Sequence, residues 1–162
     1  MSKAIFLDRD GVLISNRNQY YIWKQDQLEF IDGVFENLQL LSLKRFNLFI
    51  VSNQGGISRG LYSKSDVRIL HAGLIQTFRK NRIEISEIGY CPHHPEFEKC
   101  LCRKPDSLMI EKLLAKNKLS REDSYLIGDS ETDMEAARRA GIQGIKISPN
   151  QNMYPFISFL LT

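Results

Sequence analysis

Five short apolar runs, separated mostly by longer amphipathic segments, constrain the fold of this chain more than any other feature. The runs are Ala4–Leu7, Leu48–Ser52, Ile88–Cys91, Tyr125–Gly128 and Gly144–Ile147. Runs of this length and composition are typical of strands that are buried on both faces. Because helical patterns lie between most of them, the order predicts an α/β fold with a parallel sheet covered on both faces.

Apolar residues recur at helical spacing in four of the intervening segments. The residues that mark these helices are Val34, Leu38 and Leu41; Val67, Leu70, Leu74 and Phe78; Ile110, Leu113 and Leu114; and Met134 with Ala137. The segments 14–30, 53–62 and 92–106 lack this pattern and are predicted as long loops. At 162 residues the chain has the length of one ordinary domain, so we expect residues 1–162 to form a single domain.

Charge and hydropathy exclude several classes of protein. The chain has 22 Lys and Arg against 19 Asp and Glu, and a net charge of +3 does not argue for a nucleic-acid partner. No apolar run approaches the ~20 residues that a membrane helix needs, and the first run is too short for the core of a signal peptide. We therefore expect a soluble, cytoplasmic protein without nucleic acid or membrane, and the charge is compatible with an anionic small substrate.

Polar side chains follow four of the five predicted strands. They are Asp8 and Asp10 after the first, Ser52, Asn53 and Gln54 after the second, Cys91 after the third with Arg103 and Lys104 further along its loop, and Asp129 and Asp133 after the fourth. Ligands of open parallel sheets bind outside the carboxyl ends of the strands. The sequence therefore predicts one functional site at this edge of the sheet.

The acidic residues of this set suit covalent and metal chemistry. Asp8 and Asp10 are two apart on an extended segment and point to the same side, so one can attack an electrophile while the other handles protons. Asp129 can join Asp8 around Mg²⁺, which prefers carboxylate oxygens. The alternative for Asp129 and Asp133 is the capping of a helix N-terminus, where Asp is also favoured.

Two further motifs suit a phosphoryl group. The segment 52–56, Ser-Asn-Gln-Gly-Gly, can supply hydrogen-bond donors, and Lys104 with Arg103 can offset negative charge. Each has an ordinary alternative, a polar turn for the first and a solvated basic pair for the second.

All three cysteines lie within twelve residues, next to histidines. Cys91, His93, Cys100 and Cys102 make up a closed tetrahedral set for a structural Zn²⁺, with His94 as a substitute for His93. An odd, clustered set of cysteines argues against a disulfide framework and for a reducing compartment.

In this order the motifs resemble those of the haloacid-dehalogenase-like phosphatases, from Ala4 to about Ile147. The zinc-containing branch without a cap domain is the most similar. The motifs that carry the likeness are Asp8-Arg-Asp-Gly, Phe30-Ile-Asp-Gly33, Ser52-Asn-Gln, Cys91-Pro-His-His-Pro95 and Cys100-x-Cys-Arg-Lys-Pro105. The resemblance implies a Rossmann-like three-layer fold with a central parallel sheet, no large cap domain and a zinc-stapled loop, in a monomer.

The same resemblance implies a Mg²⁺-dependent phosphomonoester hydrolase that works through an aspartyl-phosphate. Asp8 would be the nucleophile and Asp10 the proton donor and then acceptor, with Ser52 and Lys104 stabilising the phosphoryl group. Mg²⁺ would be held by Asp8, the backbone carbonyl of Asp10 and Asp129, and Zn²⁺ by the Cys and His set. A small phosphorylated metabolite would contact Asn16, Arg17, Asn18, Gln19, Asn53, Gln54, Gly55, Arg103 and Ser130.

Two substrates stay open within this branch, a heptose 1,7-bisphosphate and histidinol phosphate, beside other small sugar or polyol phosphates. The segment 56–60, Gly-Ile-Ser-Arg-Gly, is similar to the heptose enzymes, and this is the substrate we expect. The short zinc loop is closer to the histidinol enzymes, and Ser130 departs from the heptose enzymes, which usually have a Lys at this position.

Two other classes of protein compete with an enzyme. A zinc-binding nucleic-acid module would concentrate its basic residues in one stripe, whereas here they are spread along the chain. An inactive scaffold would not need the intact set of Asp8, Asp10, Lys104 and Asp129.

Overall fold

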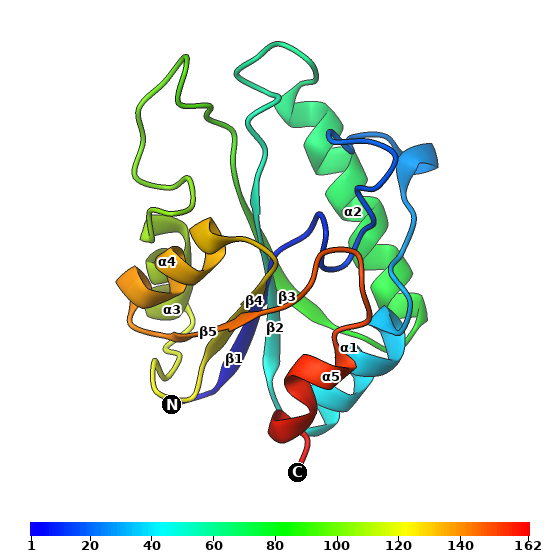
Figure 1. Ribbon diagram of the computed structural model, residues 1–162, viewed down its shortest axis with the longest axis vertical. Helices are drawn as coiled ribbons and strands as arrows, with labels where there is room; N and C mark the ends of the chain where they lie inside the picture. Colours follow the sequence, from blue (N-terminus) through cyan, green and yellow to red (C-terminus); the bar gives the residue numbers. More distant parts are fainter.

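The computed structural model describes residues 1–162 around a five-stranded parallel sheet with helices on both faces (Figure 1). The strands are β1 (Ala4–Leu7), β2 (Asn47–Asn53), β3 (Ile85–Cys91), β4 (Tyr125–Gly128) and β5 (Gln143–Lys146), in the order β3-β2-β1-β4-β5. This confirms the predicted three-layer α/β fold. β3 begins three residues before the predicted run, because Ile85 pairs with Leu48 of β2 although the charged Glu87 follows it.

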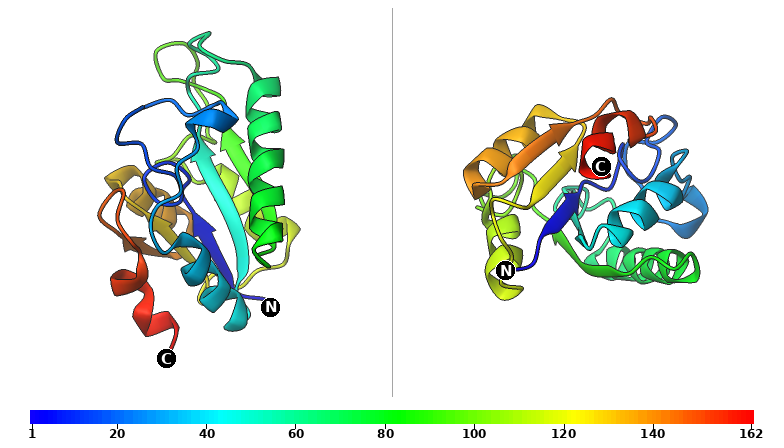
Figure 2. Two further views of the ribbon diagram at one scale, coloured as in Figure 1. Left: turned by 90° about the vertical axis from the view of Figure 1, so that its right-hand side faces the viewer. Right: turned by 90° about the horizontal axis from the view of Figure 1, so that it is seen from below.

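Alternate side chains of the strands point to opposite faces of the sheet, and each face has its own core. Ile5 and Leu7 of β1 belong to one core, whereas Ala4 and Phe6 belong to the other. The first core is covered by α1 (Val34–Leu43), α2 (Lys64–Lys80) and α5 (Tyr154–Ile157), and the second by α3 (Leu108–Lys116) and α4 (Glu131–Ala140). Figure 2 shows the two helix layers on either side of the sheet.

The C-terminal segment packs onto the first core. Ile157 of α5 is fully buried there together with Met153, and Leu160 of the short 3-10 helix η2 (Ser158–Leu160) packs against it. The apolar tail of the chain is thus part of the fold. No helix of the structure combines the length and the apolar character needed to cross a membrane.

All five strands run in one direction, so their carboxyl ends and the long loops gather at the upper edge in Figure 1. Segment 8–33, which contains only the 3-10 helix η1 (Gln25–Gln27), and the loops 54–63 and 92–107 surround this edge, and no large cap domain covers it. The chain first fills one half of the sheet through β1, β2 and β3 and then crosses to β4 beside β1. The reversal of strand order between β1 and β4 is where open α/β sheets bind their ligands.

Candidate active site

An acidic cluster lies at the point where the strand order reverses. Asp8 follows β1, Asp129 follows β4 and Asp133 lies in the first turn of α4, and their carboxylate oxygens lie within 4.8 Å of one another. The buried Lys104 places its Nζ 2.9 Å from Asp8 Oδ1 and 2.6 Å from Asp133 Oδ1. Three carboxylates beside one ammonium leave an excess of negative charge that suits a divalent cation with a preference for oxygen ligands, such as Mg²⁺.

Burial and this excess of negative charge shift the pKa values in the cluster. The pKa of Asp8 is raised to about 7, first by burial and then by the charges of Asp133 and Asp10, against the opposing effect of the Lys104 ammonium. Burial lowers the pKa of Lys104, but Asp8 and Asp133 outweigh it and hold that pKa above its ordinary value. Lys104 is therefore charged at neutral pH, and a cation beside Asp8 would favour the ionised carboxylate that a nucleophile needs.

Asp133 has two roles in the structure. It forms a capping box with Ser130 at the start of α4, and its other oxygen contacts Lys104. The sequence suggested the capping of a helix for this residue, and the capping is present. The contact with Lys104 also gives Asp133 a part in the acidic cluster, so both of the roles that the sequence left open are present.

Asp10 faces the same cavity as Asp8 but has different partners. Arg9 donates from Nε to Asp10 Oδ1 at 2.8 Å and from Nη2 to Oδ2 at 2.9 Å, and Gln54 Nε2 lies 3.4 Å from Oδ2. The two carboxylates of the Asp-x-Asp motif thus have separate surroundings, one with the lysine and the acidic cluster and the other with an arginine.

The loop that carries Arg103 and Lys104 is fixed to the end of β2. Asn53 Nδ2 donates to the Lys104 carbonyl at 3.0 Å, and the Lys104 N–H donates back to Asn53 Oδ1 at 3.0 Å. Lys104 Nζ also donates to the carbonyl of Val51 at 2.9 Å. These bonds place the ammonium beside Asp8, although the two residues are 96 positions apart in the sequence.

A cavity of about 540 Å³ opens above these groups and is lined mostly by polar residues. Of the residues that the sequence assigned to catalysis, Mg²⁺ or substrate, the lining includes Asp8, Asp10, Asn16, Ser52, Asn53, Gln54, Gly55, Arg103, Lys104, Asp129 and Ser130. Arg17, Asn18 and Gln19 are exposed and lie outside the lining. Arg17 instead donates to the carbonyl of Asn150 at 2.9 Å.

Several lining residues were not predicted. They are Tyr20, Tyr21, Tyr62, His94, Pro95, Pro105 and Thr132. The one sequence signal for these residues was the pair of adjacent tyrosines, Tyr20 and Tyr21, in an otherwise polar loop. Nothing in the sequence indicates the contact between Tyr21 and Tyr62, whose ring centroids lie 6.1 Å apart, because the fold alone brings them together.

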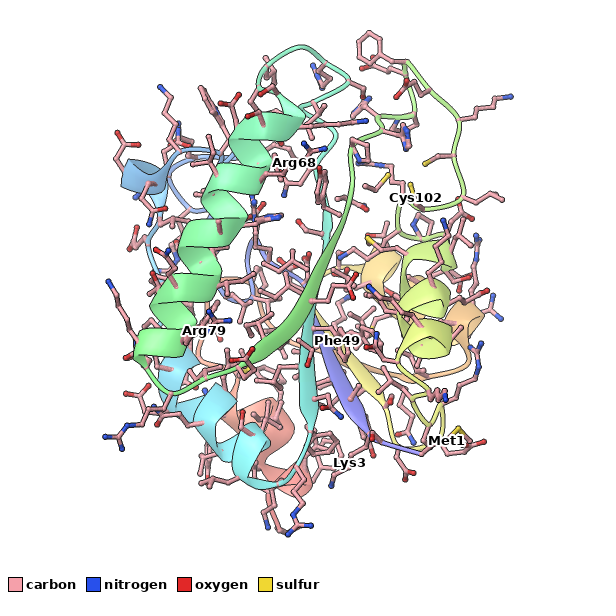
Figure 3. The ribbon with its side chains drawn as sticks, turned by 180° about the vertical axis from the view of Figure 1, so that it is seen from behind. Met1, Lys3, Phe49, Arg68, Arg79 and Cys102 are labelled. Atoms are coloured by element: carbon pink, nitrogen blue, oxygen red, sulfur yellow. The ribbon has the colours of Figure 1, made fainter.

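The cysteine and histidine side chains of the loop after β3 form the predicted cluster, near the labelled Cys102 in Figure 3. Cys91 Sγ lies 3.4 Å from His93 Nδ1 and 3.6 Å from Cys100 Sγ, and His93 Nδ1 lies 3.3 Å from Cys102 Sγ. Burial raises the pKa of the Cys91 thiol, so three thiolates here would need a cation. The donor set and its spacing suit a tetrahedral Zn²⁺. His94 faces the cavity instead, where it lies beside Gly55.

Comparisons with known proteins agree with the fold and the site. A family model described as HAD-hydrolase-like matches residues 101–150. The D-glycero-alpha-D-manno-heptose-1,7-bisphosphate 7-phosphatase of Campylobacter jejuni is 40% identical over 87% of this chain and 79% of its own length. The histidine biosynthesis bifunctional protein HisB of Legionella pneumophila is 33% identical over 91% of this chain, but over only 42% of its own length.

Among solved structures, the D,D-heptose 1,7-bisphosphate phosphatase of B. bronchiseptica with magnesium and phosphate has the same fold. The TM-score is 0.84 at 24% identity, over 98% of this chain and 87% of that one. The identity to the Campylobacter jejuni enzyme places the chain among hydrolases of the HAD class, and the acidic cluster and lysine at the carboxyl edge of the sheet agree with this. The chain belongs to the haloacid-dehalogenase-like phosphatases, as the motifs of its sequence indicated.

Proposed function

We propose that the chain removes the phosphate on C7 of D-glycero-D-manno-heptose 1,7-bisphosphate in a Mg²⁺-dependent reaction. The observation that carries this proposal is the position of Asp8 in a polar cavity, 2.9 Å from the Lys104 ammonium and with Asp10 in the same cavity. The similarity to the Campylobacter jejuni enzyme supports the choice of substrate. The enzyme would act as a monomer on this small metabolite, without nucleic acid.

In the first half of the reaction Asp8 attacks the phosphorus atom. A bond forms between an Asp8 carboxylate oxygen and phosphorus, while the bond from phosphorus to the sugar oxygen breaks. Asp10 gives its proton to that oxygen, so the sugar leaves as an alcohol rather than an alkoxide. Lys104, with Ser52 at the end of β2, offsets the charge of the phosphoryl oxygens.

In the second half the aspartyl-phosphate is hydrolysed. Asp10, now ionised, takes a proton from a water molecule, whose oxygen bonds to phosphorus as the bond to Asp8 breaks. Inorganic phosphate leaves, and both carboxyl groups return to their first state. The substrate is positioned by Asn16, Gln54, Gly55 and Arg103, which line the same cavity.

Two metal ions complete the proposal. Asp8, Asp129 and the backbone carbonyl of Asp10 would hold Mg²⁺, which supplies positive charge to the phosphoryl oxygens when bound. Cys91, His93, Cys100 and Cys102 would hold Zn²⁺, and four protein ligands leave no open position for chemistry. A zinc ion held there would therefore be structural and would fix the wall of the cavity formed by His94, Pro95 and Arg103.

A second candidate substrate is histidinol phosphate. The match to part of HisB supports it, as does the short loop between His93 and Cys100. The chemistry at Asp8 and Asp10 is the same for both substrates, so only a direct comparison separates them.

Release of inorganic phosphate with Mg²⁺ tests the proposal on both anomers of the heptose bisphosphate and on histidinol phosphate. We expect kcat/KM to favour the heptose substrate by ~100-fold or more, about 2.7 kcal/mol of transition-state binding. Asp8→Asn should abolish release, whereas Asp26→Asn, at an exposed position outside the cavity, should not. A preference for histidinol phosphate would overturn the choice of substrate, and no release from any phosphate ester would overturn the reaction.

A further inference from the structure

We propose that Arg9 and His71 are positioning residues that hold the carboxyl group of Asp10 in the orientation needed to protonate the leaving group. This inference rests on the proposed function, since it concerns the acid of that reaction. Neither residue touches the cavity, and the reaction described above uses neither of them.

Arg9 is a fully buried arginine directly between the two carboxylates of the motif. Its Nε and Nη2 bind both oxygens of Asp10, and Nη2 also donates to the carbonyl of Ile22 at 2.6 Å. A buried guanidinium is costly unless it is paired and hydrogen-bonded. Both oxygens of Asp10 accept from Arg9, and Asp10 supplies the opposite charge in the half of the reaction in which it is ionised. A planar fork of this kind fixes both the direction and the rotation of a carboxyl group.

His71 holds the far edge of the same guanidinium. It lies on α2, the helix that carries the labelled Arg68 and Arg79 in Figure 3, and its Nε2 lies 3.1 Å from Arg9 Nη1. Burial lowers the pKa of His71 to about 3, with a further contribution from Arg9, so the ring is neutral at working pH. Because arginine has only donors, Nε2 of the neutral ring must be the acceptor.

A second set of hydrogen bonds reaches Asp10 from the loop after β2. Tyr62 donates from its hydroxyl to Gln54 Oε1 at 2.7 Å, which directs Gln54 Nε2 toward Ser52 Oγ at 2.7 Å and Asp10 Oδ2 at 3.4 Å. Burial raises the pKa of Tyr62 to about 12, so the hydroxyl keeps its proton. Asp10 is thus held on one side by Arg9 and on the other by Gln54, and it keeps partial exposure toward the cavity.

The consequence depends on how much the leaving group needs a proton. An alkoxide is a poor leaving group, so its departure slows when the acid is misaligned. A dinitrophenolate leaves without a proton, so its departure does not depend on Asp10. The later hydrolysis of the aspartyl-phosphate uses Asp10 with every substrate, so the two substrates are compared by kcat/KM, which reports only the steps up to departure of the leaving group. A role of Arg9 and His71 in positioning Asp10 predicts a selective loss with alkyl phosphates, whereas a merely structural role predicts an equal loss with both.

The test compares His71→Leu with His71→Gln, whose Oε1 can replace Nε2 as an acceptor. For His71→Leu we expect kcat/KM on an alkyl phosphate to fall roughly tenfold or more, while kcat/KM on dinitrophenyl phosphate stays within about threefold. His71→Gln should recover most of the loss. Arg9→Lys keeps the charge but loses the fork and should show the same selective pattern, which provides a second test if His71→Leu does not fold.

Phe78→Leu is the matched control, because Phe78 is buried on the same helix and contacts Phe30 and Phe35 rather than Arg9. It should lower the melting temperature without separating the two substrates. Equal losses on both substrates in His71→Leu and Arg9→Lys would overturn the inference while leaving the proposed function intact. A wild-type chain that hydrolyses neither substrate, or an Asp8→Asn chain that hydrolyses both, would instead overturn the proposed function and this inference with it.

Discussion

The neutral state of His71 makes the stability of the fold depend on pH. Burial lowers its pKa from the ordinary 6.5 to about 3, so between these values the unfolded chain binds a proton that the folded chain does not. The free energy of unfolding should therefore fall as the pH decreases from about 6.5 toward 3, by up to about 1.4 kcal/mol per pH unit from this one residue.

His71→Gln removes this titration and keeps an acceptor for Arg9. Urea unfolding at a series of pH values should show a shallower loss of stability in the variant, since all other titrating groups are shared. Parallel curves for the two chains between pH 6.5 and pH 4 would mean that His71 is protonated in the folded state.

Gly11 shows how a single residue fixes the acidic cluster. Its φ of +88° is a conformation that favours glycine, and a Cβ at this position would collide with Asp129 Oδ2. Gly11→Ala should therefore displace Asp129 and weaken Mg²⁺ binding by roughly tenfold or more, measured as the Mg²⁺ concentration that gives half-maximal turnover.

Gly60→Ala is the control for this substitution. Gly60 also has a positive φ, of +74°, but a Cβ there would meet open space. Both variants should lose about 1 kcal/mol from backbone strain, and only Gly11→Ala should change the Mg²⁺ requirement. The same Mg²⁺ requirement in both chains would show that the collision is absorbed without moving Asp129.

Among the elements, the segment between β5 and α5 is fixed to segment 8–33 of the site. Asn150 donates its N–H to the Gly11 carbonyl at 2.8 Å, and its Oδ1 accepts from the Asn16 N–H at 2.9 Å. Asn150→Gly suits its φ of 59° and removes only the side-chain bond, so Asn16 at the cavity wall becomes less fixed. One such bond contributes about 0.5–1.5 kcal/mol, which predicts an increase in KM of about 2- to 13-fold with little change in kcat.

Asn150→Asp provides the comparison, because it keeps an acceptor and tolerates the same backbone conformation. We expect its KM to stay near that of the natural chain in steady-state kinetics. A KM in Asn150→Gly that matches the natural chain would show that Asn16 is held without this bond.

The elements also show which parts of the site the sequence could predict. Strands and helices follow from local periodicity, and Asp8, Lys104 and Asp129 follow from their places after strands. The partners of Asp10 could not be predicted in this way. In the sequence Arg9 is simply a charged residue next to a carboxylate, and nothing indicates that it is buried. Its contact with His71, 62 residues away, exists only once α2 has packed beside the sheet.

At the scale of the whole molecule, the two proposed metal sites belong to different parts of the structure. The acidic cluster lies at the switch between β1 and β4, whereas the cysteine cluster staples the loop that connects β3 to α3. Gln54 N–H donates to the Cys91 carbonyl at 2.7 Å, so the stapled loop is joined to the end of β2. Loss of zinc should therefore disturb stability and the cavity wall, and loss of Mg²⁺ should disturb only turnover.

We expect Cys100→Ser to bind less than one zinc per chain and to melt roughly 5 °C or more below the natural chain, with its residual activity still dependent on Mg²⁺. Lys99→Ser, at the exposed neighbouring position, should change neither value. Unchanged zinc content and melting in Cys100→Ser would contradict a structural zinc.

Brief removal of Mg²⁺ from the natural chain should abolish turnover reversibly and leave the melting temperature within about 2 °C. Lys104 lies two residues beyond Cys102, the last residue of the proposed zinc site, so zinc bound there would also help to hold the Lys104 ammonium beside Asp8.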